Sequence, residues 1–234
     1  MILLKKTGFT LAETLITLVI IGIIAALTVP VMITKYQKEQ TVTKLKKAYS
    51  TLAQTTSRAI ADNGPIKTWE IGTTSSEENL RIFFEQYIRP YISVMGEGTT
   101  YEQGGWNRKH YRLNGNSINN SANDIRYYLN DGTSLTIEQI TNNETRIRIK
   151  IDIDINGEKK PNQVGKDIFG VFYYTYYPER PNVVGKFVPD GGWLPYEYLS
   201  SEEQPDSCLK GHTGYWCFAK IMADSWQIKD DYPW

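Results

Sequence analysis

Residues 9–33 read FTLAETLITLVIIGIIAALTVPVMI, and Glu13 is their only charged residue. The hydrocarbon core of a bilayer is about 30 Å thick, and roughly 20 helical residues cross it. The segment is therefore long and apolar enough to form a transmembrane helix. Lys5 and Lys6 precede it, and this basic start predicts that the N-terminus faces the cytoplasm.

The helical pattern continues beyond the apolar segment. Over residues 34–61 the larger apolar side chains recur at helical spacing and form one stripe, which consists of Val42, Leu45, Tyr49, Leu52 and Ile60. Residues 62–65 (DNGP) then end the helix. Pro30 lies inside the predicted helix, and we expect it to bend the helix near the junction of the two parts.

The composition of the whole chain limits its class. The 234 residues include 26 Lys and Arg and 26 Asp and Glu, and this zero net charge argues against general electrostatic capture of nucleic acid. Mean hydropathy of -0.42 excludes a membrane protein with many spans. Two cysteines are too few for a disulfide-dense mini-protein. The composition fits a soluble globular part with one membrane segment.

Two common interpretations of the N-terminus leave part of it unexplained. A cleaved secretory signal peptide fits poorly, because Glu13 interrupts the apolar run and the best cleavage candidate, at residues 25–26, lacks a small-x-small pattern. A plain signal anchor fits the span but gives Glu13 no role. A lone carboxylate in a membrane helix costs a few kcal/mol and normally has a partner or a function.

Residues 8–13, GFTLAE, account for the whole block. They closely resemble the G-F-T-L-x-E prepilin signal of type IV pilins and of the pseudopilins of type II secretion systems. The resemblance covers roughly the first 60 residues and includes Pro30. It implies that prepilin peptidase cuts after Gly8 and N-methylates Phe9. It also implies that Glu13 neutralises the amino terminus of a neighbouring subunit during filament assembly.

The resemblance implies a division of the chain into a leader (1–8), a transmembrane and polymerisation helix (9–33), its amphipathic continuation (34–64) and a globular head (65–234). It implies a single-pass inner-membrane protein with the head outside the cytoplasm, which then joins a filament in the periplasm or on the cell surface. The implied partners are prepilin peptidase, the same or other pilin subunits and the inner-membrane assembly platform. Type IV pilus and type II secretion pseudopilus both stay open, as does a signal-anchored periplasmic binding module or enzyme that does not polymerise.

The rest of the sequence predicts an α+β head, in which the long helix packs on an antiparallel sheet. Ser75 and Glu78 predict a capping box for a short helix that ends at Pro90. Residues 93–124 are rich in Gly, Asn and Ser and predict a long irregular loop. The predicted strands are 125–130, 133–140, 146–155 and 168–177, and a short helix is predicted over 218–226.

The strand at 146–155 has the clearest pattern. It reads RIRIKIDIDI, which places the isoleucines toward the core and the charged side chains toward solvent. Asp131-Gly132 predicts a hairpin turn between the two preceding strands. The aromatic residues at the C-terminus, which are Trp226, Tyr232 and Trp234, are expected to pack back on the head.

Residues 152–157, DIDING, match the opening of an EF-hand loop, but Gln163 stands where the bidentate acid is required. A calcium site of another kind stays open, because Asp167 is near enough to close it and pseudopilin heads often carry calcium in an Asp-rich loop. The alternative is the exposed face of a strand followed by an Asn-Gly turn. No cofactor is otherwise expected. The candidate calcium ligands are Asp152, Asp154, Asn156 and Asp167.

Cys208 and Cys217 lie close together in the sequence, and outside the cytoplasm such a pair is most simply a disulfide. Closing so short a loop contributes up to about 3 kcal/mol. The alternative is a zinc site that adds Asp206 and His212, although the spacing fits no strong zinc pattern. Many type IV pilins close a C-terminal loop with such a disulfide.

Nothing in the sequence predicts catalysis. The chain has two histidines, His110 and His212, and no Gly-x-Ser-x-Gly, phosphate loop or His-Glu-x-x-His motif. We therefore expect a structural subunit and not an enzyme.

Overall fold

A computed structural model describes residues 8, 10–100, 109–119, 121–143 and 146–234. The chain divides into two compact units, the first ending at Gln40 and the second beginning at Thr41. Both contain part of the first helix, α1 (Leu11–Asn63).

Helix α1 confirms the predicted N-terminal helix, and it is helical on both sides of Pro30. It ends at Asn63, and Gly64 follows with a φ of 78°, a left-handed conformation that glycine adopts without strain. The helix is long and apolar enough to cross a membrane, judged by length and composition. This agrees with a membrane-anchored protein.

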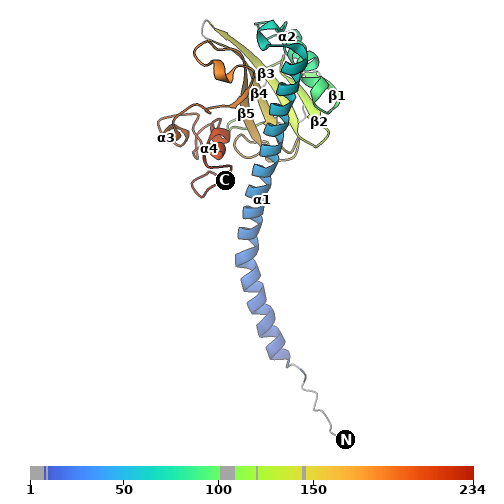
Figure 1. Ribbon diagram of the computed structural model, residues 1–234. Helices are drawn as coiled ribbons and strands as arrows, with labels where there is room; N and C mark the ends of the chain where they lie inside the picture. Colours follow the sequence, from blue (N-terminus) through green and yellow to red (C-terminus); the bar gives the residue numbers. More distant parts are fainter. Residues whose placement is uncertain (1–7, 9, 101–108, 120, 144–145) are drawn as a thin grey trace. The chain divides into compact units, whose positions relative to one another are not determined.

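The second unit contains a six-stranded antiparallel sheet, with the strands side by side in chain order (Figure 1). This sheet and α1 confirm the predicted α+β class. The strands are β1 (Val94–Thr100), β2 (Ile125–Leu129), β3 (Ser134–Asn143), β4 (Arg146–Asp154), β5 (Ile168–Tyr176) and β6 (Phe187–Pro189).

The predicted turn at Asp131-Gly132 joins β2 to β3. The Leu129 amide donates to the Thr133 carbonyl at 2.8 Å, and Gly132 has a φ of 86°. The Asp131 carboxylate accepts from the Thr133 amide at 3.1 Å, which fixes the turn further. Short-range turn chemistry therefore sets the pairing register of these two strands.

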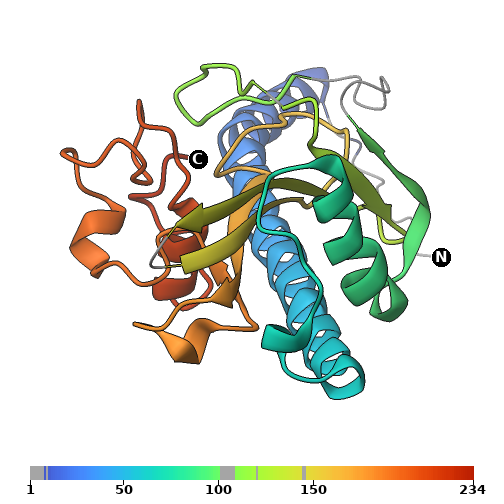
Figure 2. The same cartoon turned by 90° about the horizontal axis from the view of Figure 1, so that it is seen from above.

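One face of the sheet carries the main core. Alternate residues of β4 point into it, and Ile149, Ile151 and Ile153 are at most 1% exposed. The second part of α1 contributes Leu45 and Leu52 to the same cluster, as the stripe over residues 42–60 predicts. The short helical segment after α1 packs there too (Figure 2), through Leu80, Phe83, Phe84, Tyr87 and Ile88.

That segment differs in detail from the prediction. It runs as α2 (Glu77–Arg81), a π-helical stretch (Ile82–Ile88) and a 3₁₀ turn (Arg89–Tyr91). Its N-cap is Ser76, which accepts from the Asn79 amide, and not the predicted Ser75. The Ser75 hydroxyl instead contacts the backbone of Ile140 in β3, donating to its carbonyl and accepting from its amide. A contact distant in sequence thus moved the cap by one residue.

Strand β1 contradicts the predicted irregular loop over 93–124. Its sequence, VMGEGTT, lacks the alternation of a half-buried strand, and it pairs on one side with β2. An edge strand needs only one neighbour to satisfy its backbone, so weak local preference was sufficient. Part of the same predicted loop, residues 101–108, lies outside the described residues.

The second face of the sheet contradicts the expectation that the charges of β4 face solvent. Asp152 is 7% exposed and Asp154 is 3% exposed. Later segments cover this face: Tyr215 lies against Lys150, and the Asp190 amide donates to the Gly170 carbonyl. Phe172, Tyr174 and Tyr177 form a second apolar cluster there. The alternation of β4 is real, but both of its faces are buried toward the end of the strand, where Asp152 and Asp154 lie.

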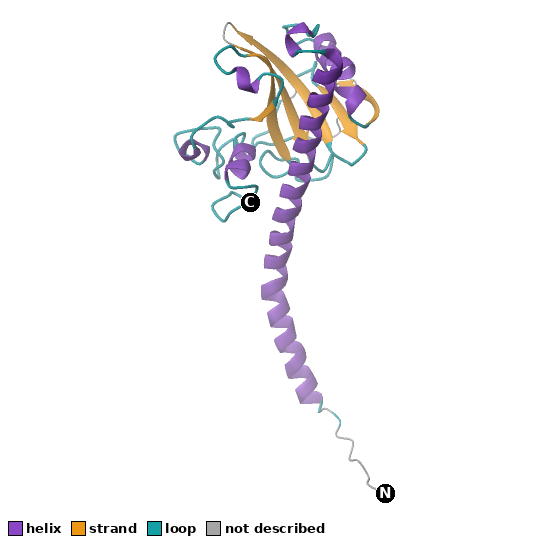
Figure 3. Cartoon of the chain, viewed as in Figure 1, coloured by secondary structure: helices purple, strands orange, loops and turns teal. Residues whose placement is uncertain are grey.

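The chain after β5 is mostly loop (Figure 3). It contains a 3₁₀ turn at Pro181–Val183 and the helices α3 (Tyr196–Leu199) and α4 (Cys217–Ala223). Another 3₁₀ turn, at Ile66–Thr68, follows α1. Helix α4 ends before the predicted 226, because Ser225 and Trp226 have positive φ angles of 58° and 61°. The C-terminal aromatic residues pack on the head as predicted, with Trp226 against Tyr49.

Candidate functional site

The start of α1 is a reciprocal cap made by two residues of the prepilin signal. The Glu13 carboxylate accepts from both the amide and the hydroxyl of Thr10, each at 2.8 Å. The Thr10 hydroxyl accepts from the Glu13 amide at 3.2 Å. This is the capping box Thr-x-x-Glu, in which each side chain satisfies a backbone N–H of the first turn. Sequence reasoning assigned Glu13 to assembly alone and overlooked this spacing.

The first part of α1 exposes apolar side chains all around. Between residues 11 and 33 the large apolar side chains range from 47% exposed for Val29 to 79% for Leu11. Leu18, Val19, Ile20 and Ile21 are consecutive and exposed, and at about 100° per residue they point in nearly every direction around the helix axis. Such a surface needs an apolar environment on all sides.

Two processing residues precede the helix. Gly8 is exposed, with no other part of the described chain within 4 Å of a side chain placed there. Phe9 and most of the leader lie outside the described residues. Cleavage after Gly8 and methylation of Phe9 therefore stay predictions.

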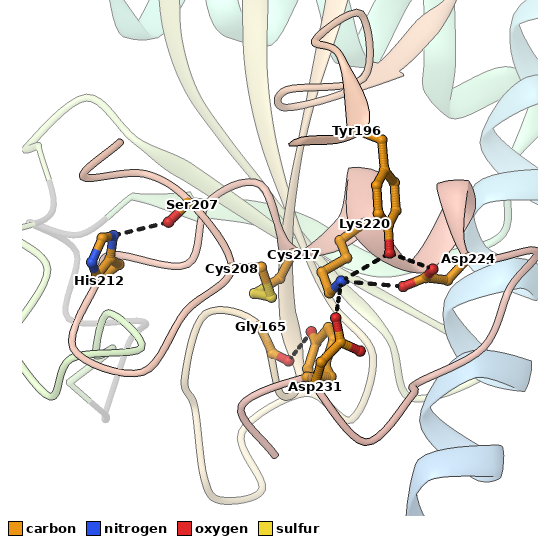
Figure 4. Close-up of a disulfide and its surroundings, with 10 residues drawn as sticks. Gly165, Tyr196, Ser207, Cys208, His212, Cys217, Lys220, Asp224 and Asp231 are labelled. Carbon is orange, nitrogen blue, oxygen red and sulfur yellow. Dashed lines mark hydrogen bonds and ion pairs between the residues drawn. A yellow bond between two sulfur atoms is a disulfide. The ribbon is translucent and has the colours of Figure 1, made fainter. Parts of the chain in front are cut away.

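The predicted disulfide is present (Figure 4). The Cys208 and Cys217 sulfur atoms are 2.01 Å apart, and both residues are fully buried. The disulfide contradicts the zinc alternative, whose other members also have protein partners: Asp206 accepts from the Thr213 hydroxyl at 2.8 Å, and His212 contacts the Gln204 carbonyl at 2.8 Å.

His212 also lies 2.9 Å from the Ser207 hydroxyl through the same ring atom, Nδ1. This pair does not have the geometry of a nucleophile and its base. The Gln204 carbonyl only accepts hydrogen bonds, so Nδ1 carries the proton and cannot accept one from Ser207. A serine next to a base needs that acceptor in order to become nucleophilic.

A buried ion cluster lies beside the disulfide (Figure 4), and sequence reasoning missed it. Lys220 of α4 is 0% exposed, and its Nζ lies 2.7 Å from Asp231 and 3.4 Å from Asp224. The Tyr196 hydroxyl lies 3.3 Å from Lys220 and donates to Asp224 at 2.9 Å. The i, i+4 spacing of Lys220 and Asp224 can be recognised in the sequence, but the burial of the pair cannot. The cluster ties the C-terminal segment to α3 and α4.

A row of polar side chains crosses the second face of the sheet. Arg126 in β2 contacts His110 at 2.8 Å and the Thr136 hydroxyl at 3.1 Å. Burial, with Arg126 nearby, lowers the pKa of His110 to about 4, so the ring is neutral near pH 7. Lys150 lies 2.5 Å from Glu138 and 3.7 Å from Asp152. These charges are paired within the head.

The four candidate calcium ligands separate into two places. Asp152 belongs to the row just described, beside Lys150. Asn156 and Asp167 meet in the loop between β4 and β5, where the Asn156 side-chain amide donates to Asp167 at 3.2 Å. Asp154 lies at the start of that loop, and its carboxylate accepts from the Asn156 backbone amide at 3.1 Å. Among the described residues, no three His, Cys, Asp or Glu side chains gather as a metal site.

Comparison with known proteins gives two matches. Residues 3–29 match the prokaryotic N-terminal methylation motif, which shows that the segment containing Gly8 and Glu13 is a type IV pilin-like prepilin segment. Residues 31–234 match a family described as "Family of unknown function (DUF6613)". No curated protein and no solved structure was found to match. The second match covers most of the chain, so the chain belongs to the family of unknown function DUF6613, behind an N-terminal methylation motif of the pilin type.

Proposed function

We propose that the chain is a structural subunit of a pilin-like filament, either a type IV pilus or a type II secretion pseudopilus. The match of residues 3–29 to the N-terminal methylation motif carries this proposal. Prepilin peptidase cuts the precursor after Gly8 and methylates the new N-terminal residue, Phe9. The mature chain then assembles with copies of itself or with related subunits on the inner-membrane assembly platform.

The apolar start of α1 supports a polymerisation role. Its side chains are exposed in nearly every direction, and a head packed against one side of a helix would leave the others in water. Before assembly, lipid covers the whole surface, which gives a single-pass inner-membrane protein with its head outside the cytoplasm. In the filament, neighbouring helices replace the lipid.

Glu13 has a role in both states. In the single chain its carboxylate is satisfied by Thr10 through the capping box. Cleavage after Gly8 creates a positively charged amine on Phe9, one helical turn before Glu13. In the filament, Glu13 of one subunit pairs with the Phe9 amine of a neighbouring subunit, because an apolar bundle favours a paired carboxylate over a lone one.

Mass spectrometry of the mature chain tests the processing. We expect the N-terminal residue to be Phe9 with one added methyl group. A mature chain that retains Met1 would overturn the proposal and favour a signal-anchored binding module or enzyme that does not polymerise.

Two Glu13 variants separate the charge from the cap. Glu13→Ala removes both, and Glu13→Gln keeps a hydrogen-bonding side chain without the charge. We expect both variants to be cleaved and to give no filaments in the sheared surface or periplasmic fraction, while Glu39→Gln, an acid of α1 beyond the apolar segment, assembles normally. Normal filaments from Glu13→Gln would refute the pairing with the terminal amine.

A further inference from the structure

Two arginines near the start of β4 lie on the second face of the sheet. Arg146 and Arg148 are alternate residues of the strand, and Arg148 stands opposite Tyr174 of β5. Burial raises the pKa of the Tyr174 hydroxyl, and Arg148 and then Arg146 oppose this rise. Both guanidiniums therefore lie near the same hydroxyl.

Aromatic rings connect these arginines to a third one. The Arg148 guanidinium lies 3.7 Å from the centre of the Phe172 ring, and the Arg180 guanidinium lies 5.9 Å from that of the Trp193 ring. The Tyr174 ring lies between the two, 6.3 Å from Phe172 and 5.8 Å from Trp193. Arginine stacks favourably on such rings, which restricts its long side chain. The three arginines are termed the basic patch: Arg146, Arg148 and Arg180.

The basic patch makes no ion pair with any carboxylate of the residues that the structure describes. Burial raises the pKa of Asp190 to about 6, and Lys150 and then Arg148 oppose this rise. Arg148 and Asp190 nevertheless form no ion pair. Arg180 is exposed, and Arg146 and Arg148 are half-buried, so the patch can receive carboxylates from outside the head.

A second surface of the head has the opposite charge. The segment from Phe187 to Leu209 contains five Asp and Glu residues and no Lys or Arg. Three of these acids are exposed, in α3 and in the turn after it, and none of the three forms an ion pair within the described part of the chain. They are termed the acidic patch: Glu197, Glu202 and Glu203.

The two patches lie at different places on one head. No ion pair joins them among the described residues, and α3 lies apart from the end of the sheet where β4 begins (Figure 1). Two complementary surfaces at different places on one molecule make a heterologous contact, which joins copies head to tail into an open array. Opposite charges on the two surfaces also favour the correct partner and its orientation.

We propose that the acidic patch of one subunit docks on the basic patch of a neighbouring copy in the filament. This contact rests on the proposed function and goes beyond it, because that function leaves open whether a subunit's neighbour is a copy of itself or a related protein. A head that carries both halves of the contact makes the chain its own neighbour.

Charge reversal in the full chain tests the contact, with filaments measured in the sheared surface or periplasmic fraction. Glu202→Lys/Glu203→Lys and Arg146→Glu/Arg180→Glu each replace attraction by repulsion, and we expect each to lower the filament yield by about tenfold or more. Both leave Arg148 on the Phe172 ring. The combined fourfold variant carries the same two surfaces with their charges exchanged, and we expect it to assemble again.

Glu78→Lys/Glu97→Lys is the matched control, because it makes the same change in net charge on two other exposed acids of the head. It should assemble as the native chain does. The melting temperature of each variant shows whether its head is folded. If the variant of the basic patch does not fold, Glu202→Lys/Glu203→Lys alone decides.

Three results would overturn the proposal in distinguishable ways. A normal filament yield from Glu202→Lys/Glu203→Lys would remove the contact. A fourfold variant that folds but assembles no better than its two parents would remove the assignment to a second copy. Both results leave the proposed function standing, whereas a native chain that forms no filaments would overturn the contact and the proposed function together.

Discussion

Removing the disulfide should destabilise the head by an amount that the loop length predicts. Cys208 and Cys217 are 9 residues apart in the sequence. In the chain-entropy treatment, a cross-link over about nine residues removes about 8.7 cal/mol/K from the unfolded chain, or about 2.6 kcal/mol at 25 °C. Both cysteines are fully buried, so Cys208→Ala/Cys217→Ala also leaves small cavities. We therefore expect a loss of about 3 kcal/mol.

Thermal unfolding of the full chain in detergent, followed by circular dichroism, measures this loss. For a domain of this size, about 3 kcal/mol corresponds to a decrease in melting temperature of about 6–12 °C. Reductant should lower the melting temperature of the native chain by a similar amount and leave that of the double variant unchanged. Equal melting temperatures for the oxidised native chain and the double variant would refute the reasoning.

Two further predictions concern buried titratable groups of the head. Lys220→Met should lower the free energy of unfolding in urea by about 3 kcal/mol, because it leaves Asp224 buried with Lys229 as its remaining basic partner among the described residues. Adding Asp224→Asn should recover part of this loss, and no recovery would contradict the ion pair. For His110, the unfolded ring binds a proton below about pH 6.5 and the folded ring only below about 4. Its contribution to stability is therefore present above pH 6.5 and is lost as the pH falls toward 4, by about 3 kcal/mol at most. The difference in unfolding free energy between the native chain and His110→Gln should shrink over this window, and a constant difference would argue against the shift.

The features predicted from sequence depend on short-range chemistry. The apolar helix, the Asp131-Gly132 turn and the isoleucine alternation of β4 each follow from residues within a few positions of one another. The disulfide followed from two nearby cysteines and an expected location. In each case the local preference and the tertiary structure agree, so the local pattern was sufficient.

The features that were missed depend on what lies across the sheet. Asp152 and Asp154 alternate with isoleucines as solvent-facing residues would, and only the loops that cover this face bury them. Ser75 has a suitable capping sequence, but Ile140 provides it with a better-placed partner.

Helix α1 combines two patterns that require different surroundings. From Leu45 to Ala59 its buried residues recur every three or four positions, so one side of the helix is covered and the head alone is enough. From residue 11 to residue 33 no such stripe exists, because consecutive apolar residues face all directions. A single packed face cannot cover that surface; lipid or several neighbouring helices can. The two family matches divide near the end of the first part, one ending at residue 29 and the other beginning at residue 31. Polar substitutions on every side of the first part should therefore impair membrane insertion or assembly, whereas in the second part only those on the buried stripe should destabilise the head.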